Sequence, residues 1–150
     1  MRLVARYFSF SHRDRRALYE AGFCLVWARL LLLFPFRRIA PFLGRAEPVN
    51  AARPVAALSD EQRREAVAVR RALLRISRHL PWHSSCLVCA IAGRIMLRRR
   101  RMPSLLQLGA RIDSPVALAA HAWLRSGDVD VTGADVASQY SPIVAFEAQG

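Results

Sequence analysis

The sequence predicts an α+β fold, in which a helix that begins with a cysteine packs on a small antiparallel sheet behind an N-terminal helical extension. Apolar residues recur at steps of three and four over residues 59–80, which is helical periodicity. A second helical pattern begins at Cys86. Short strand-like segments follow, and turn residues separate two of them. Helices first and strands afterwards indicate an α+β chain rather than an alternating α/β chain.

The length predicts one compact core rather than two ordinary domains, since the chain has 150 residues and 53% hydrophobic content. We expect the catalytic core to span residues 59–150. Residues 1–58 are expected to form an extension, made of an N-terminal apolar helix and a proline-containing linker.

The apolar helix is expected over residues 12–36, where Pro35 ends it. Its most apolar run is shorter than the roughly 20 residues that a membrane span needs, and Arg29 lies within it. We expect this helix to pack on the core. The alternative is an interfacial or partner-binding helix, because arginines flank the apolar run on both sides. Residues 37–58 contain three prolines and lose periodicity, so they predict a linker or a loop wrapped around the core.

The charge predicts an anionic partner. The formal net charge is +12, and every one of the 23 basic residues counted as Lys+Arg is an arginine. Nucleic acid, acidic peptide surfaces and anionic lipid would all be attracted. The arginines are scattered along helices and no zinc-finger or RNP-type signature accompanies them, so we expect no nucleic-acid partner, while peripheral membrane contact stays open. An odd number of cysteines without a signal-peptide layout predicts a cytoplasmic location.

The elements of the predicted core have local signals. Ser59 and Gln62 have the spacing of a capping box, and Pro81 ends the helix that they begin. Ser84 or Ser85 can cap the next helix, which runs from Cys86 to about residue 100. We expect strands at 104–111, 118–125 and 129–132, with hairpin chemistry at 126–128.

Cys86 is the candidate nucleophile, because a thiol at a helix N-terminus meets unpaired N–H groups and the positive end of the helix dipole. An acyl-transfer thiol also needs a base to take its proton and return one to the leaving amine. His121 is the candidate base. It stands in a small apolar stretch of a predicted strand, where an imidazole would be costly to bury without a partner.

The third member of a catalytic triad would orient the imidazole. If the last two predicted strands pair across a two-residue turn, Asp130 and Thr132 share a face with His121. In one register Thr132 is directly opposite His121 and Asp130 is diagonal to it. We therefore predict Asp130 as this third member, and Thr132, Asp135 and Asp113 are weaker candidates.

Cys86 and Cys89 form a C-x-x-C pair, which is also typical of metal or redox sites. A zinc site would need two further ligands, and only His83 lies near in sequence. The strand that precedes a thioredoxin-type dithiol is missing from the pattern. We predict no metal and no cofactor, and we interpret Cys89 as a packing residue. His83 is a candidate contributor to an oxyanion or substrate site.

Several stretches together resemble the leader peptidase of lasso-peptide biosynthesis in its stand-alone form. They are a proline-tryptophan loop leading to a Cys-Leu helix start, an arginine-rich helix end, a Leu-Gly strand segment and a His-Ala-Trp strand, at residues 80–87, 95–103, 108–109 and 121–123. The resemblance covers about half of the chain and implies a papain/transglutaminase-like core. It assigns Cys86 as nucleophile and His121 as base. Family members place the acid about a dozen residues after the histidine, here near Thr132 and Gly133, neither of which is acidic.

The resemblance implies hydrolysis of the bond between leader and core of a lasso-peptide precursor through a thioester on Cys86. It also implies two protein partners, a separate leader-binding recognition protein and an asparagine-synthetase-like lasso cyclase. Two further hypotheses remain open from the residues alone. A transglutaminase-like acyltransferase would open the same thioester with an amine. A non-enzymatic basic protein bound to membrane or nucleic acid would use neither Cys86 nor His121.

Overall fold

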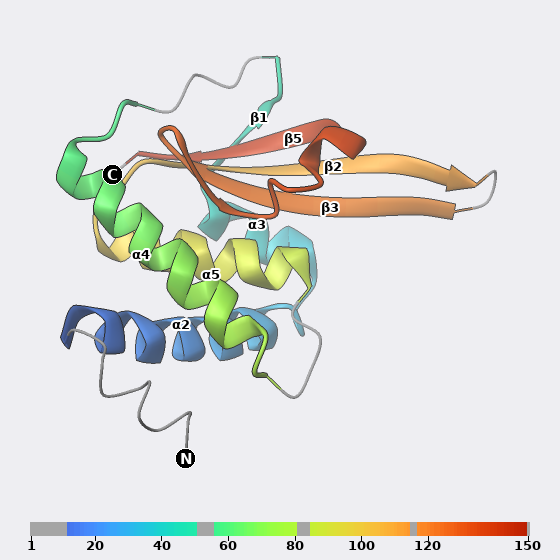
Figure 1. The fold of residues 1–150 in the computed structure, drawn as a ribbon. Helices are drawn as coiled ribbons and strands as arrows, with labels where there is room; N and C mark the ends of the chain where they lie inside the picture. Colours follow the sequence, from blue (N-terminus) through green and yellow to red (C-terminus); the bar gives the residue numbers. More distant parts are fainter. Residues whose placement is uncertain (1–11, 51–55, 81–84, 115–116, 150) are drawn as a thin grey trace.

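A computed structural model describes residues 12–50, 56–80, 85–114 and 117–149. Over these ranges it confirms the α+β class, with helices α2, α4 and α5 together on one side of a five-stranded antiparallel sheet (Figure 1). The helices are α2 (His12–Leu31), α3 (Phe36–Leu43), α4 (Asp60–Ser77) and α5 (Cys86–Arg99). The strands are β1 (Arg45–Pro48), β2 (Ser104–Ser114), β3 (Ala117–Ser126), β4 (Val129–Thr132) and β5 (Ser141–Ala148), and the 3-10 helix η1 (Ala137–Gln139) precedes β5.

The sheet has the strand order β1-β5-β2-β3-β4, and each neighbouring pair is antiparallel. β2 and β3 form a long hairpin that extends beyond the helices (Figure 1). The turn from β3 to β4 lies where the sequence predicts it. Ser126 pairs with Val129 across two residues, and Gly127 takes the positive φ of 53° that such turns favour.

The starts of α4 and α5 also agree with their sequence signals. Ser59 Oγ accepts a hydrogen bond from Gln62 N, and the Gln62 side chain accepts one from Ser59 N, which completes the capping box. Ser85 caps α5 by accepting from Val88 N at 3.3 Å. Both caps satisfy N–H groups that a helix start leaves unpaired.

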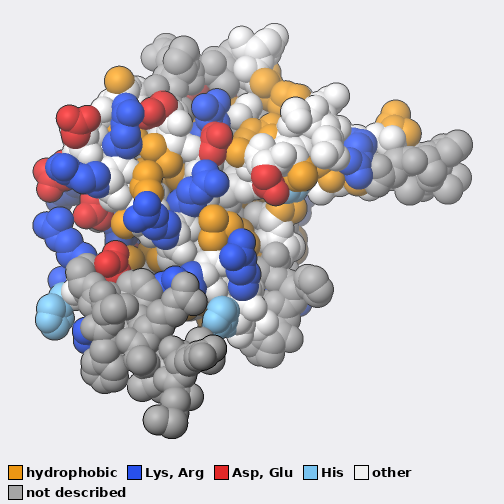
Figure 2. Space-filling view, viewed as in Figure 1, with side chains coloured by type: hydrophobic (Ala, Val, Ile, Leu, Met, Phe, Trp, Pro, Cys, Tyr) orange, Lys and Arg blue, Asp and Glu red, His pale blue; other side chains and the backbone are white. Residues whose placement is uncertain are grey.

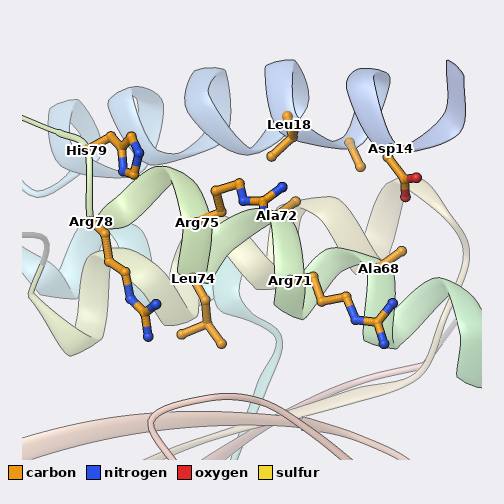
Figure 3. A pocket seen from close by; sticks show the side chains of 10 residues that line it. Asp14, Leu18, Ala68, Arg71, Ala72, Leu74, Arg75, Arg78 and His79 are labelled. Carbon is orange, nitrogen blue, oxygen red and sulfur yellow. The ribbon is translucent and has the colours of Figure 1, made fainter. Parts of the chain in front are cut away.

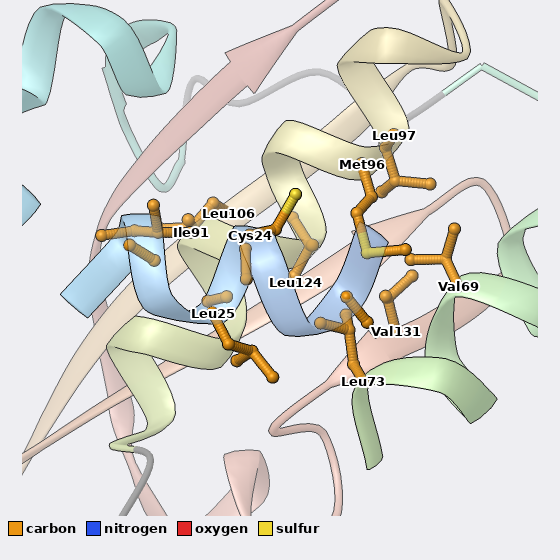
Figure 4. Close-up of a cluster of buried hydrophobic side chains, with 14 of the residues drawn as sticks. Cys24, Leu25, Val69, Leu73, Ile91, Met96, Leu97, Leu106, Leu124 and Val131 are labelled. Atoms are coloured by element: carbon orange, nitrogen blue, oxygen red, sulfur yellow. The ribbon is translucent and has the colours of Figure 1, made fainter. Parts of the chain in front are cut away.

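The core lies between the helices and the sheet (Figure 4). At Gly93, α5 packs tightly against β3 and α4, because a Cβ placed there would lie 2.7 Å from Leu124 Cδ2 and 3.1 Å from Leu73 Cδ1. Side chains from three helices and three strands meet around it. Those labelled in the figure are Cys24 and Leu25 of α2, Val69 and Leu73 of α4, Ile91, Met96 and Leu97 of α5, and Leu106, Leu124 and Val131 of the sheet.

A buried arginine connects α5 to the sheet. Arg94 is only 2% exposed. Its guanidinium donates to the carbonyl and the hydroxyl oxygens of Ser104, at 3.0 and 3.1 Å, and to the carbonyl oxygen of Phe146. Burial lowers the pKa of this group to about 10. One side chain thus joins the first residue of β2 and the C-terminal part of β5 to the central helix.

The N-terminal region is more closely integrated than a linker would be. α2 packs on α4 and α5, as expected for the helix. Residues 36–48, where the prolines predict irregular chain, instead contain α3 and β1, and β1 pairs with β5 from Arg45 opposite Glu147 to Pro48 opposite Val144. Pro41 is accommodated inside α3, a helix too short to lose much from one missing N–H donor.

The outer face of α2 is also apolar, although the described chain leaves it uncovered. Five large side chains along it are exposed. They are Tyr19, Phe23, Val26, Trp27 and Leu30. The rings of Phe23 and Trp27 stack with centroids 6.4 Å apart. Within the described ranges, no helix has both the length and the apolar character to cross a bilayer.

Candidate active site

Cys86 is the first residue of α5, as predicted, and its thiol is free and partly exposed. The first turn of α5 contains no acidic residue. Cys86 therefore lies at the helix end where backbone N–H groups are unpaired, and no carboxylate stands in the same turn.

The other two thiols have raised pKa values. Burial raises the pKa of Cys89 to about 11, with a further contribution from the nearby Cys86. Burial also raises the pKa of Cys24 to about 11, and Glu20 adds to the effect. Since the thiolate is the nucleophile, both groups are almost unreactive near neutral pH. Cys89 packs against the core, which agrees with its interpretation as a packing residue.

His121 lies on β3 opposite Gly109 of β2. Its Nε2 is 2.7 Å from the carbonyl oxygen of Gly133. A carbonyl only accepts hydrogen bonds, so Nε2 must donate and the proton of the neutral ring resides there. Nδ1 then carries the lone pair. The imidazole is thus held in the tautomer in which Nδ1 can act as a base.

Two aromatic rings fix the plane of this imidazole. Tyr140, which follows η1, stacks on it with a centroid separation of 4.9 Å and an interplanar angle of 27°. Trp123 lies two residues further along β3, with its ring 6.0 Å away. The Trp123 indole is in turn held by Gln107 of β2, whose Oε1 accepts from Nε1 at 2.9 Å.

Gly133 owes its place in the site to its missing side chain. Its φ is +71°, a region that L-residues with a Cβ rarely adopt. A Cβ would overlap the carbonyl oxygen of Ala122 and would come within 3.1 Å of His121 Nε2. Only glycine therefore lets the chain turn here with its carbonyl aimed at the imidazole.

The register of β4 differs from the one that led to Asp130. Arg125 pairs with Asp130, but Leu124 pairs with Thr132, so β4 contains a bulge at Val131. The prediction that Thr132 lies opposite His121 is wrong. The Asp130 carboxylate instead forms an ion pair with Arg125 at 2.7 Å. Arg125 is four residues from His121 on the same strand, a separation of about 13 Å.

Of the weaker candidates from the sequence, which are Asp135, Asp113 and His83, only Asp135 has a described side chain. Asp135 is exposed and lines a hollow beside α4. The side chain of Asp113 and the whole of His83 lie outside the described residues.

Three residues of the site carry no signal that sequence reasoning recognised. They are Gly133, Tyr140 and Gln107. A backbone carbonyl has no residue signature, although Gly133 does stand at the spacing where the resembled family places its acid. Tyr140 and Gln107 reach the site only through the folding of the sheet.

Cys86 and His121 approach the sheet from different directions. The Leu124 side chain points at α5. Because side chains alternate along a strand and the pairing of this part of β3 with β2 is regular, His121 leaves β3 on the other face. In the described part of the chain, no hydrogen bond joins its ring to the Cys86 thiol. β4 pairs with β3 only as far as Leu124, and the chain that follows passes Ala122 and His121 at Gly133. A thiol–imidazole contact requires the His121 ring to move to the α5 side of the sheet.

Comparison with known proteins places the chain in a family. A family model described as the transglutaminase-like superfamily matches residues 30–145, which include α5, the candidate residues and nearly all of the sheet. No curated protein and no solved structure matches the chain significantly.

Proposed function

We propose that this chain, which belongs to the transglutaminase-like superfamily, is a cysteine peptidase that removes the leader from a lasso-peptide precursor. The superfamily suggests chemistry of the cysteine peptidase or acyltransferase kind. The observation that carries the peptidase proposal is a pair of groups in the matched region. They are a free, partly exposed thiol at a capped helix start and an imidazole held with its Nδ1 lone pair available.

The reaction would proceed in two steps on Cys86. Once the His121 ring has moved to the α5 side of the sheet, its Nδ1 takes the thiol proton, and the sulfur attacks the carbonyl carbon of the bond between leader and core. The new C–S bond forms as the C–N bond breaks, and the imidazolium returns its proton to the leaving amine. Water then attacks the thioester with the same base, which releases the leader carboxylate and the thiol. The amide of Cys86 is the proposed donor to the oxyanion.

In the conformation described here Gly133, rather than an acidic residue, orients the His121 ring. Its carbonyl holds the ring by its Nε2 proton but carries only a partial negative charge. It would therefore stabilise the imidazolium less than a carboxylate does. Asp130 remains a candidate only if β4 changes its pairing, because its carboxylate is bound to Arg125. We expect a slower base and a larger dependence on correct substrate binding.

The leader-peptidase assignment is supported by the resemblance of the segments around Cys86, residues 95–103 and His121 to stand-alone lasso-peptide leader peptidases. We propose the same partners. A separate recognition protein would bind the leader, and an asparagine-synthetase-like cyclase would take the released core. A non-enzymatic role as a basic binding protein is what would remain if the following experiment failed.

The experiment is to incubate a lasso-peptide precursor and its recognition protein with this chain and to follow leader release by mass spectrometry. Wild type is compared with Cys86→Ala, His121→Ala and the matched control Cys89→Ala. We expect release to disappear with Cys86→Ala and to fall at least about a hundredfold with His121→Ala. Cys89→Ala should remain active. Undiminished release by Cys86→Ala would exclude the mechanism.

Alkylation provides an independent check on the nucleophile. At about pH 8, thiols with a pKa of about 11 are ionised to roughly one part in a thousand. Iodoacetamide should therefore label Cys86 before Cys24 or Cys89, and labelling should abolish leader release. An added amine distinguishes hydrolysis from acyl transfer, because a transferase would give the amide of the leader instead of its carboxylate.

A further inference from the structure

Three hollows lie along α4 and share lining residues. The first, of about 440 Å³, is lined by the start of α4 and by α2. The second, of about 500 Å³, lies between the middle of α4 and α2 and shares Ala68 and Arg71 with the first (Figure 3). The third, of about 380 Å³, lies between the end of α4 and the end of β4 and shares Leu74 and Arg78 with the second. The three neighbouring hollows are together called the α4 trough.

Arginines dominate the α4 trough. Figure 2 shows arginine side chains gathered over this face of the molecule. Those from α4 and its C-terminal end that line the trough are Arg63, Arg64, Arg70, Arg71, Arg75 and Arg78. Four acids line the same hollows, namely Asp14, Glu65, Asp130 and Asp135. Glu65 pairs with Arg100 at 3.2 Å, and Asp130 pairs with Arg125. Within the described residues, no ion pair neutralises Arg71 or Arg78. Arg63 pairs with Asp128 at 3.2 Å, and Arg70 donates to the carbonyl oxygen of Asp130 at 2.6 Å. The trough therefore has a net positive charge, to which Arg71 and Arg78 contribute without an ion pair.

The floor between these charges is apolar. Leu18 of α2 and Ala68, Ala72 and Leu74 of α4 line the second hollow. Arg75 extends on the side of α4 that faces α2, whereas Arg71 and Arg78 extend on the other side (Figure 3). Exposed arginines over an apolar floor suit a chain that alternates carboxylates with aliphatic side chains. The only ring that lines the described trough is His79. Single-stranded nucleic acid prefers grooves with aromatic platforms for its bases, so the lining favours a peptide.

The third hollow of the trough reaches a residue that contacts the candidate base. Thr132 and Gly133 line its third hollow, and the Gly133 carbonyl holds the His121 ring. From Arg64 to Arg78 the helix rises about 21 Å. An extended peptide covers that length with about six or seven residues. A peptide bound along α4 would thus have one end beside Gly133, whose carbonyl oxygen lies 2.7 Å from His121 Nε2.

We propose that the α4 trough binds an extended acidic peptide segment with aliphatic side chains, and that this segment is the part of the substrate on one side of the cleaved bond. The second half of this statement rests on the proposed peptidase function, whereas the first half does not. Arg71 and Arg78 supply charge-assisted hydrogen bonds to its carboxylates. The floor formed by Leu18 and Leu74 accepts its aliphatic groups.

Binding is tested on Cys86→Ala protein, so that no cleavage is involved. The probe is a fluorescent peptide of about 12 residues that alternates Glu with Leu, followed by anisotropy at about 150 mM salt. We expect Arg71→Gln and Arg78→Gln each to raise Kd about tenfold. Arg45→Gln is the matched control, because Arg45 is exposed on β1 and pairs with Glu47. It should leave Kd unchanged.

Three outcomes would overturn the inference. One is an unchanged Kd in both trough variants. The second is an equal loss in the Arg45 control. The third is a single-stranded oligonucleotide of the same charge that binds as tightly and loses affinity in the same variants, which would make the trough a nucleic-acid site.

Failure of leader release with intact peptide binding would contradict the proposed function alone. Intact leader release by both trough variants would sink the substrate half of the inference alone.

Discussion

The imidazole Nε2 of His121 lies 2.7 Å from the carbonyl oxygen of Gly133, twelve residues along the chain. This bond determines which ring nitrogen carries the proton, and it does so without an ionised partner. The orientation and tautomer of the candidate base are therefore set by a backbone turn. The strength and orientation of this base should depend on Gly133 more than on any acidic side chain of β4.

Gly133→Ala should damage both the site and the fold. The new methyl group would overlap the Ala122 carbonyl and press on the imidazole. We expect at least about a tenfold loss of leader release and a loss of about 1–3 kcal/mol in the free energy of unfolding. Gly22→Ala in α2 is the control, because its Cβ would meet only Ile76 Cγ2 at 3.9 Å. That variant should gain up to about 1 kcal/mol by urea unfolding and keep its activity.

Tyr140 is expected to act as a positioning residue. Its ring stacks on His121 and also lies under the Arg111 guanidinium, 4.8 Å from the ring centroid. Tyr140→Ala should lower the kcat of leader release about tenfold, because the imidazole loses one of the surfaces that fix its plane. Tyr140→Phe keeps the ring and should restore most of the rate. Equal rates for wild type and Tyr140→Ala would show that the stack is irrelevant to catalysis.

The sequence predicts those parts of this fold that have local signals. Ser59 with Gln62, Ser85 before Cys86, and Gly127 in the hairpin turn each act within a few residues, and each appears where expected. β1 and β5 were not predicted, since their pairing joins Arg45 to Glu147 from opposite ends of the chain. No local signal marks them as neighbours.

The candidate site also has a part that local sequence signals predict and a part that they do not. Residue chemistry identifies Cys86 and His121 as candidates, because a helix start and an imidazole on a strand can be recognised locally. The bulge in β4 cannot be recognised so, because nothing in Val129–Thr132 differs from a regular strand. This one-residue shift moves Thr132 opposite Leu124 and so removes the argument from register for a side chain facing His121. The turn at Gly133 supplies a carbonyl instead.

The raised pKa values of Cys24 and Cys89 should make the fold sensitive to alkaline pH. The pKa of Cys89 rises from 9.0 to about 11 in the folded chain, so between these values the folded thiol keeps a proton that the unfolded thiol has lost. Stability is therefore fully present below about pH 9 and falls as pH rises towards about 11, by about 2 kcal/mol for Cys89. Urea midpoints measured across this range should fall less steeply for Cys89→Ala than for wild type. A parallel decline would contradict the assignment.

Arg94 should be among the most sensitive positions in the core. Its removal would leave the carbonyls of Ser104 and Phe146 without their buried donor. We expect Arg94→Ala to cost about 3–5 kcal/mol in the free energy of unfolding. Arg98 is exposed on the same helix, and Arg98→Ala should change stability by no more than about 0.5 kcal/mol. Similar urea midpoints for the two variants would show that the guanidinium contributes no net stability.

The exposed apolar face of α2 affects the tendency of this chain to self-associate. A helix that is apolar on both faces is typical of the interior of a larger assembly, whereas here Phe23, Trp27 and Leu30 face solvent. In dilute buffer, mutual repulsion from a net charge of +12 keeps such faces apart. Added salt weakens that repulsion and leaves the attraction between rings intact. The colloidal behaviour of the purified chain is thus set by ionic strength, and its solubility is highest where counter-ions are scarce.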